Sequence, residues 1–193
     1  MIIVTSFIRQ SVAGLRALLV LTVVLGLLYP ALVWGVGQAV GRSQAAGSLV
    51  TVDGAVVGSS LIGQEWKGEK WFHSRPSAGD YTGDVSGGSN LGHGPDLDAA
   101  VAERAKQAGI PVQGSPADAL TASASGLDPH VTPENAAQQV ARVSAARGLP
   151  ASDVQRLVDE HTQGRTLGFL GEPRVNVLQL NLALQGLTTA ATG

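Results

Sequence analysis

One uninterrupted apolar segment constrains the fold more than any other feature of this chain. Residues 17–37 contain no charged side chain, no Asn and no Gln. A helix of this length, at about 1.5 Å per residue, reaches about 30 Å, which is the thickness of the hydrocarbon layer of a membrane. Pro30 is tolerated in such a helix when a local kink or a neighbouring helix satisfies the freed carbonyl. The sequence therefore predicts one transmembrane helix over residues 17–40.

A cleavable secretory signal is the alternative interpretation of the same segment. Residues 43–45, Ser-Gln-Ala, resemble a small-residue cleavage site. The apolar region of a signal peptide runs for about 7–15 residues, however, and this segment is longer. The length favours a permanent span.

The charges on either side of the span predict its orientation. Arg9 and Arg16 precede it and residues 1–16 contain no acid, whereas Arg42 is the single basic residue between the span and Asp53. Basic residues close to a span stay preferentially on the cytoplasmic side. We therefore expect a short cytoplasmic N-terminus at residues 1–16 and an extracytoplasmic domain at residues 41–187.

The charge balance and the lack of cysteine exclude several classes of protein. Three of the 13 Lys and Arg lie by residue 42, so the remaining 10 face all 15 Asp and Glu, and residues 43–193 carry about −5. This balance argues against nucleic-acid binding. With no cysteine, the outer domain has no disulfide framework and must be held together by a buried core.

Turn and capping signals outline the first part of the outer domain. Leu49–Val52 and Ala55–Val57 flank an Asp-Gly pair, the pattern of a two-stranded hairpin with a tight turn. Residues 58–94 are rich in Gly and lack helical periodicity, so we expect loop and short strands. Pro95 then opens a predicted helix to Ala108, with Gly109 as its stop. The expected inward face of this helix consists of Leu97, Val101, Ala105 and Ala108.

The second part predicts further helices. Thr132 as N-cap, with Pro133 in the first turn, begins a helix that ends at Gly148 and turns Val140 and Val143 inward. Ser152 with Gln155 has the form of a capping box for the next helix, whose apolar stripe is Val154, Leu157 and Val158. Residues 175–184 fit both a helix and an alternating strand, and we favour the helix. Residues 188–193 are predicted to be a disordered tail, and the whole outer part a single α+β domain.

Three polar segments are candidate functional sites. Residues 71–78 place Arg75 between aromatic residues and a proline, where it can anchor a loop or contact an anionic partner. Residues 86–92, Ser-Gly-Gly-Ser-Asn-Leu-Gly, offer successive backbone amides for an anion, but they lack the lysine and the spacing of a phosphate loop. Residues 121–130 combine hydroxyl, carboxylate and imidazole groups within ten positions.

The third segment admits a hydrolase interpretation, with Ser123 or Ser125 as nucleophile beside Asp128 and His130. The strand-to-helix elbow that usually presents such a serine, G-x-S-x-G, is missing. Asp128 followed by proline is also typical of a turn that leads into the helix at Thr132. The four histidines share no short spacing, so we predict no metal site.

Several short motifs together resemble one known family. They follow one N-terminal span in fixed order: GSSLIGQ (58–64), RPSA (75–78), SGGSNLG (86–92), SASGLDPH (123–130) and RVNVLQLNLAL (174–184). In this combination the chain is similar to the C subunit of the bacterial Kdp potassium-transporting P-type ATPase, the KdpC family. Two loop positions depart from the family pattern, Ser74 in place of Gly, and His93-Gly94-Pro95 in place of a Pro-Thr-Asn-Pro-like string. These departures bear on local loop shape.

The resemblance implies an accessory, non-catalytic subunit of a plasma-membrane potassium pump. In that family a channel-like A subunit selects potassium, a P-type ATPase B subunit hydrolyses ATP, and a small F subunit packs alongside. The C subunit is needed for assembly and is described as a catalytic chaperone that raises the ATP affinity of the ATPase subunit. No cofactor is assigned to this chain itself; ATP enters through the ATPase subunit, and potassium is the transported ion.

The motifs supply the candidate site residues. Those expected to contact partners or shape loops are Arg75, Ser77, Ser86, Gly87, Gly88, Ser89, Asn90, Asp128, His130, Asn176 and Asn181. Small residues at four-residue spacing in and after the span, expected to pack against a partner helix, are Ala31, Gly35, Gly37 and Gly41.

Two further hypotheses follow from charge and architecture. An acidic outer domain above a pore entrance would raise the local cation concentration, an effect screened within about 8–10 Å by salt. A pilin-like structural subunit also begins with an apolar helix. It is disfavoured because no Glu occurs before Glu65, whereas pilin helices carry one near the mature N-terminus.

Overall fold

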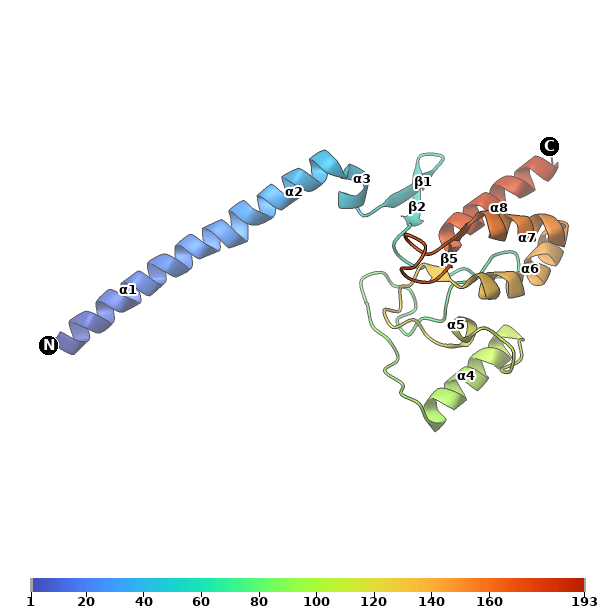
Figure 1. Ribbon diagram of the computed structural model, residues 1–193, viewed down its shortest axis with the longest axis horizontal. Coiled ribbons are helices and arrows are strands. Elements are labelled where there is room, and N and C mark those ends of the chain that lie inside the picture. Colours follow the sequence, from blue (N-terminus) through green and yellow to red (C-terminus); the bar gives the residue numbers. More distant parts are fainter. Residues whose placement is uncertain (1, 193) are drawn as a thin grey trace. The chain divides into compact units, whose positions relative to one another are not determined.

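The fold consists of an N-terminal helical unit followed by an α+β domain (Figure 1). The computed structural model describes the backbone of residues 2–192 and the side chains of residues 6–187. The first compact unit ends at Ser48 and the second begins at Leu49. This division agrees with the predicted fold class, a single apolar helix and one α+β domain.

The N-terminal unit is one long helix with a π-helical turn in its middle. It comprises α1 (Ile2–Val23), η1 (Val24–Leu28) and α2 (Tyr29–Val40), followed by the short α3 (Arg42–Ala45). Pro30 lacks the N–H that Gly26 would accept in a regular α-helix, and its ring crowds the preceding turn. The Tyr29 N–H bonds instead to the Val24 carbonyl, five residues back. The wider turn is thus the local adjustment that accommodates the proline.

Between residues 17 and 37 the surface of this helix carries no charged side chain and no Asn or Gln. Ser6–Val40 has a mean hydropathy of 2.3 over its most apolar stretch, and none of that stretch is buried within the structure. Every side chain from Ser6 to Val36 is exposed. A helix that is hydrophobic all round has to be covered by lipid or by another protein. By length and composition, Ser6–Val40 is the one described helix able to cross a membrane.

The α+β domain opens with the predicted hairpin. Strand β1 (Leu49–Val52) pairs antiparallel with β2 (Ala55–Ser59). Asp53 and Gly54 both have positive φ, 50° and 81°, as the tight hairpin turn requires. No helix or strand follows between residues 60 and 94. The predicted long loop is confirmed, but the short strands expected within it do not form.

The core of the domain lies in its C-terminal half. Helices α6 (Pro133–Arg147), α7 (Ala151–Glu160) and α8 (Val177–Thr192) pack with a three-stranded antiparallel sheet of order β3-β5-β4. The strands are β3 (His130–Val131), β4 (Thr162–Gln163) and β5 (Arg174–Asn176). The buried side chains of this core are Phe72, Val131, Ala136, Val140, Val143, Val154, Leu157, Val158, Val175, Val177, Leu180 and Leu184. Phe72 is the one member that comes from the long loop.

Two of the predicted helices have the predicted bounds. Helix α4 runs from Pro95 to Ala108 and ends in a left-handed Gly109. Helix α6 begins after Thr132, whose side chain accepts from the Asn135 N–H, and ends at Gly148. The predicted inward face of α4 is only partly correct, because Ala105 is buried while Ala108 is exposed. A further single-turn helix, α5 (Ala117–Leu120), was not predicted.

Two details near the C-terminus differ from the sequence-based expectations. The capping box at Ser152 is wrong: Pro150 is the N-cap, so Ser152 already lies in the first turn and its side chain makes no cap. Residues 175–184 divide between the two interpretations, because β5 extends to Asn176 and α8 begins at Val177. The backbone of α8 is helical to Thr192, and fraying over residues 188–193 stays a prediction.

Candidate functional site

The loop of residues 123–130 is the point where the distant motifs meet. Its backbone bonds to three earlier segments: Gly63 N–H donates to the Leu127 carbonyl at 2.8 Å, Gly87 N–H to Ser125 at 2.8 Å, and Ser123 N–H to Pro76 at 2.9 Å. The Val177 N–H of α8 donates to the Pro129 carbonyl at 3.0 Å. We call this assembly, residues 58–64, 75–78, 86–88, 123–130 and 174–184, the motif junction.

Glycines let the backbones of the motif junction approach closely. A Cβ atom on Gly63 would lie 2.4 Å from the Asp128 carbonyl oxygen, and one on Gly88 would lie 2.9 Å from that of Ala124. Gly126 has φ +70°, and its Cβ would lie 2.8 Å from the Gly87 carbonyl oxygen. Side chains at these positions would push the segments apart. Gly63, Gly88 and Gly126 are therefore required by packing.

Two serine hydroxyls bond across the same junction. Ser77 Oγ donates to the Gly126 carbonyl at 2.7 Å and accepts from the Gly79 N–H. Ser86 Oγ donates to the Ser125 carbonyl at 3.1 Å. Both serines, which were predicted as site residues, thus bind the backbone of the loop of residues 123–130.

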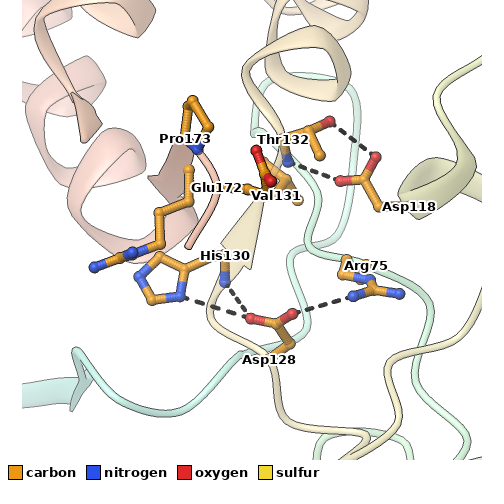
Figure 2. Close-up of a pocket in the computed structure, with 9 residues that line it drawn as sticks. Arg75, Asp118, Asp128, His130, Val131, Thr132, Glu172 and Pro173 are labelled. Carbon is orange, nitrogen blue, oxygen red and sulfur yellow. Dashed lines mark hydrogen bonds and ion pairs between the residues drawn. The ribbon is translucent and has the colours of Figure 1, made fainter. Parts of the chain in front are cut away.

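An ionic group lies at one side of the motif junction (Figure 2). Arg75 Nη1 lies 3.2 Å from Asp128 Oδ2. The other carboxylate oxygen, Oδ1, accepts from the His130 backbone N–H at 3.0 Å and lies 3.6 Å from His130 Nδ1. Burial alone would raise the pKa of Asp128, but the hydrogen bonds from His130 and Arg75 outweigh burial and hold that pKa below its ordinary value. The carboxylate therefore stays charged and orders its own turn.

Tyr81 binds the backbone of Arg75, whose side chain pairs with Asp128. The tyrosine hydroxyl donates to the Arg75 carbonyl. Burial and the nearby Glu65 charge raise the pKa of Tyr81 to about 12. The hydroxyl therefore keeps its proton, and remains a donor, at any physiological pH.

A shallow cavity of about 270 Å³ lies beside the ionic group. Its walls come from the residues drawn in Figure 2, with Asp128 and His130 below, Asp118 and Thr132 above, and Glu172 and Pro173 across. Asp118 is occupied, because its two oxygens accept from the Thr132 N–H and hydroxyl at 2.8 and 2.9 Å. Asp118 and Asp128 thus each bind a backbone N–H, which is a structural use of the charge.

Side-chain amides clamp the long loop to the core. Asn181 of α8 is fully buried and forms two bonds with Phe72, accepting from its N–H and donating to its carbonyl, both at 2.9 Å. Gln139 of α6 forms the same pair of bonds with His73, at 2.7 and 3.2 Å. Asn176 donates to the Ser60 carbonyl at 2.8 Å. These amides replace the strand that would otherwise satisfy the loop backbone.

The hydrolase arrangement is not formed. Ser123 is buried, and its hydroxyl lies 3.1 Å from that of Ser125, which in turn accepts from the Leu127 N–H. Within the part of the chain that the structure describes, neither hydroxyl bonds to the His130 imidazole. A nucleophile needs its base within hydrogen-bond reach, so this segment acts as a structural loop.

The remaining predicted residues do not belong to the segments of the motif junction. Ser89 and Asn90 are exposed, and within residues 6–187 their side chains make no hydrogen bond. Gly35 has open space around its Cβ position, whereas that of Gly37 lies 3.5 Å from the Ala45 side chain. Gly41 is not helical and forms the C-cap of α2. Packing of these small residues against a partner helix stays a prediction.

Sequence reasoning missed several residues that hold this region. Gln139 looks like an ordinary polar residue of α6, and its partner His73 lies 66 positions away. A second group joins Trp66 and Trp71, whose rings lie 5.0 Å apart, with Arg147 stacked 4.4 Å from the Trp71 ring. The dense aromatic content of residues 66–72 was the available signal for this group.

Comparison with known proteins gives one consistent result. The sequence matches the family described as "KdpC: K+-transporting ATPase, c chain" over residues 11–186. A "Potassium-transporting ATPase KdpC subunit" from Kineococcus radiotolerans is 58% identical, covering 94% of this chain and 95% of the relative. Proteins of the same name from Streptomyces coelicolor and Geobacter sulfurreducens are 47% and 52% identical, covering 98% and 93% of this chain and 97% and 98% of the relatives. The chain, with its apolar helix and its motif junction, therefore belongs to the KdpC family of potassium-transporting ATPase subunits.

Proposed function

We propose that this chain is an accessory, non-catalytic subunit of the potassium-transporting ATPase, anchored in the bacterial plasma membrane by the helix of residues 17–40. Its partners are a channel-like A subunit, a P-type ATPase B subunit and a small F subunit. The observation that carries the proposal is the family match over residues 11–186. The matched chain has one exposed apolar helix and one α+β domain.

The proposed topology has the N-terminus in the cytoplasm and the α+β domain outside. Arg9 and Arg16 flank the N-terminal end of the span, and residues 1–16 contain no acid. Basic flanks are retained on the cytoplasmic side. The outer domain, which carries about −5 over residues 43–193, then faces the side from which potassium enters.

In this topology any effect on ATP affinity is indirect. Residues 1–16, on the proposed cytoplasmic side, contain no Gly-rich phosphate cradle. A subunit can still raise the affinity of its partner by stabilising the conformation that binds ATP. We propose that the chaperone role of this subunit works by such coupling.

Co-purification tests the assembly role. A tagged full-length chain, expressed with the other ATPase chains and purified in mild detergent, is expected to retain the channel-like chain and the P-type ATPase chain. Protease added to spheroplasts tests the topology, because the α+β domain is expected to be digested while a cytoplasmic marker survives. Failure to retain either partner would contradict the function, and a protected domain would contradict the orientation.

A further inference from the structure

A second cavity of the α+β domain, of about 300 Å³, lies between the C-terminal end of α4, helix α6 and residues 69–74 of the long loop. Three of the side chains that line it are amides of α6: Asn135, Gln138 and Gln139. We call it the amide cavity. None of its described lining residues belongs to the motif junction, so the structural role of that junction does not account for it. Its volume is sufficient for one small organic molecule.

His73 gives the wall of the amide cavity an unprotonated ring nitrogen. Its Nε2 lies 3.0 Å from the Gly68 carbonyl oxygen. Because a carbonyl oxygen can only accept, Nε2 carries the proton and Nδ1 is an acceptor. Burial lowers the pKa of His73 below its ordinary value, so the ring stays neutral at physiological pH. No group among the described residues donates to Nδ1.

Gln138 has an amide oxygen whose orientation is fixed in a similar way. Its Nε2 donates to Ser115 Oγ at 2.8 Å. That hydroxyl donates its own proton to the Pro111 carbonyl at 2.6 Å, so it has to accept from Gln138. The Gln138 Oε1 therefore lies on the other side of the amide, and within residues 6–187 no group donates to it. The exposed Gln107 likewise donates to the Glu103 carboxylate at 3.0 Å, which leaves its oxygen free.

The nitrogen donors of the amide cavity, by contrast, already have partners in the wall. Gln139 Nε2 donates to the His73 carbonyl and to Asn135 Oδ1, at 3.2 and 2.9 Å. Arg142 donates to the Glu69 carbonyl at 2.7 Å and to Gln139 Oε1 at 2.8 Å. The atoms that still lack any partner in the described wall are thus acceptors, and a ligand that satisfies them has to donate hydrogen bonds.

The charges of the wall of the amide cavity cancel. Its two charged side chains are Arg142 and Glu69, with Arg142 Nε 3.8 Å from Glu69 Oε2, and His73 is neutral. An ammonium or a carboxylate ligand would add a charge for which the wall has no free counter-ion. The charge balance therefore favours an uncharged ligand.

We propose that the amide cavity binds one small uncharged polyol, up to the size of a monosaccharide. Hydroxyl groups of the polyol donate to His73 Nδ1 and Gln138 Oε1, and a hydroxyl oxygen accepts a remaining N–H of Arg142. The hydroxyl is the uncharged group that can do both. The C–H face of the polyol lies against the apolar part of the wall, at Ile110 and Ala119. This binding belongs to the α+β domain itself and does not depend on the proposed function.

Saturation-transfer difference NMR on the full-length chain, in a detergent without a sugar headgroup, tests the proposal. The probes are myo-inositol, sorbitol and glucose, and butylammonium and butyrate are the charged comparisons. At least one polyol is expected to bind with a Kd of about 1–10 mM, and both charged compounds are expected to bind more weakly than that polyol. No signal from any of the three polyols, as for a cavity that holds only water, overturns the proposal. Binding of either charged compound as tight as that of the polyol also overturns it.

Two variants locate the binding site. Gln138→Leu removes one acceptor and is expected to weaken polyol binding about fivefold to tenfold. Gln155→Leu on α7 is the matched control, because Gln155 also donates one side-chain bond of 2.8 Å, to Asp159, and lies outside the amide cavity; its Kd is expected to be unchanged.

Ala108→Trp places a bulky ring at an exposed position of the cavity wall and removes no hydrogen bond of that wall, so it is expected to abolish binding. Circular dichroism establishes that each variant is folded before the titration. If the Gln138 variant does not fold, the Ala108 variant alone decides the site. Equal affinity in the two glutamine variants, or unchanged binding in the Ala108 variant, shows that the polyol does not occupy the amide cavity.

Discussion

Asn181 shows how one side chain can hold a long loop. It is fully buried and satisfies both the N–H and the carbonyl of Phe72, a residue 109 positions earlier in the chain. Because Phe72 is itself buried in the core, these two backbone groups have no water to replace a lost partner. The amide therefore supports both the loop and the packing of its aromatic ring.

We expect Asn181→Ala to destabilise the chain by about 3 kcal/mol, since it leaves two buried backbone groups unsatisfied. For a domain of this size that loss lowers the midpoint of thermal unfolding by about 6–12 °C. Circular dichroism of the full chain in detergent measures the change. Gln179→Ala, on the exposed side of the same helix, is the control and is expected to shift the midpoint little. Equal shifts for the two variants would contradict the clamp.

Asp128 makes a second residue-scale contribution, which depends on pH. Its folded-state pKa lies below the ordinary value because His130 and Arg75 stabilise the carboxylate more than burial destabilises it. The resulting stabilisation is present above the unfolded-state pKa, near 4, and is lost as pH falls through the lower folded-state pKa.

We expect the unfolding free energy of the Asp128→Asn variant to depend less on pH in the acid range than that of the unmodified chain. The unfolding free energy of the unmodified chain should fall between about pH 5 and pH 2 more steeply than that of the variant. Denaturant titrations at a series of pH values measure the two slopes. Asp153→Asn, at an exposed helical ion pair, is the control. If it reduced the pH dependence of the unfolding free energy as much as the Asp128 variant does, the pH dependence could not be attributed to Asp128.

At the scale of elements, close backbone contacts at glycines determine how near the segments of the motif junction can lie to one another. Gly63 is close enough to the Asp128 carbonyl oxygen that a Cβ would lie 2.4 Å away, whereas Gly87 has nothing within 4 Å of its Cβ position. Both residues donate a backbone bond to the same loop. They form a natural pair for comparison.

Gly63→Ala is expected to destabilise the domain by about 1–3 kcal/mol or more, because backbone has to move to admit the methyl group. Gly87→Ala is expected to cost less than about 0.5 kcal/mol. Urea unfolding of the two full-length variants gives the difference. A Gly63 variant as stable as the Gly87 variant would show that the segments can separate freely.

Local signals predicted the elements that are local in origin. The helices at 95–108 and 133–147 carry their own caps and stops, so their bounds followed from the sequence. The hairpin turn at Asp53 and Gly54 was also predicted, although β2 extends to Ser59, two residues beyond the predicted end. Strands β3 and β4 have two residues each, too few to show alternation, and exist because β5 lies between them. The five motifs were visible, but their meeting at residues 123–130 depends on bonds between segments that no local pattern connects. The same limit hid Gln139 and its bond to His73.

At the scale of the whole molecule, the net charge of the α+β domain is the feature that follows most directly from composition. Residues 43–193 carry about −5. If this domain faces the entry side of the pump, its negative potential raises the local cation concentration. The effect is modest and is screened by salt over about 8–10 Å.

The triple variant Asp53→Asn, Asp84→Asn, Asp96→Asn removes three exposed acids and keeps an Asn-Gly pair in the hairpin turn. We expect the apparent potassium affinity of the assembled pump to fall by about twofold at low ionic strength and to match the unmodified pump near 0.15 M salt. Lys67→Gln with Lys70→Gln, which makes the domain more acidic, is expected to act in the opposite direction. Potassium uptake measured at both ionic strengths tests this hypothesis. An unchanged apparent potassium affinity at low salt would show that the negative potential of the domain does not affect potassium binding.

Helix α8 is synthesised after every segment that it holds. Asn176 and Asn181 reach back to Ser60 and Phe72, and Val177 bonds to the carbonyl of Pro129. A nascent chain that stops short of residue 174 thus lacks the two asparagines that bind the long loop of residues 60–94. It also lacks the buried apolar side chains of β5 and α8. We therefore expect the domain to complete its folding only after α8 has been translated, and an interrupted product to be recognised by proteases as unfolded.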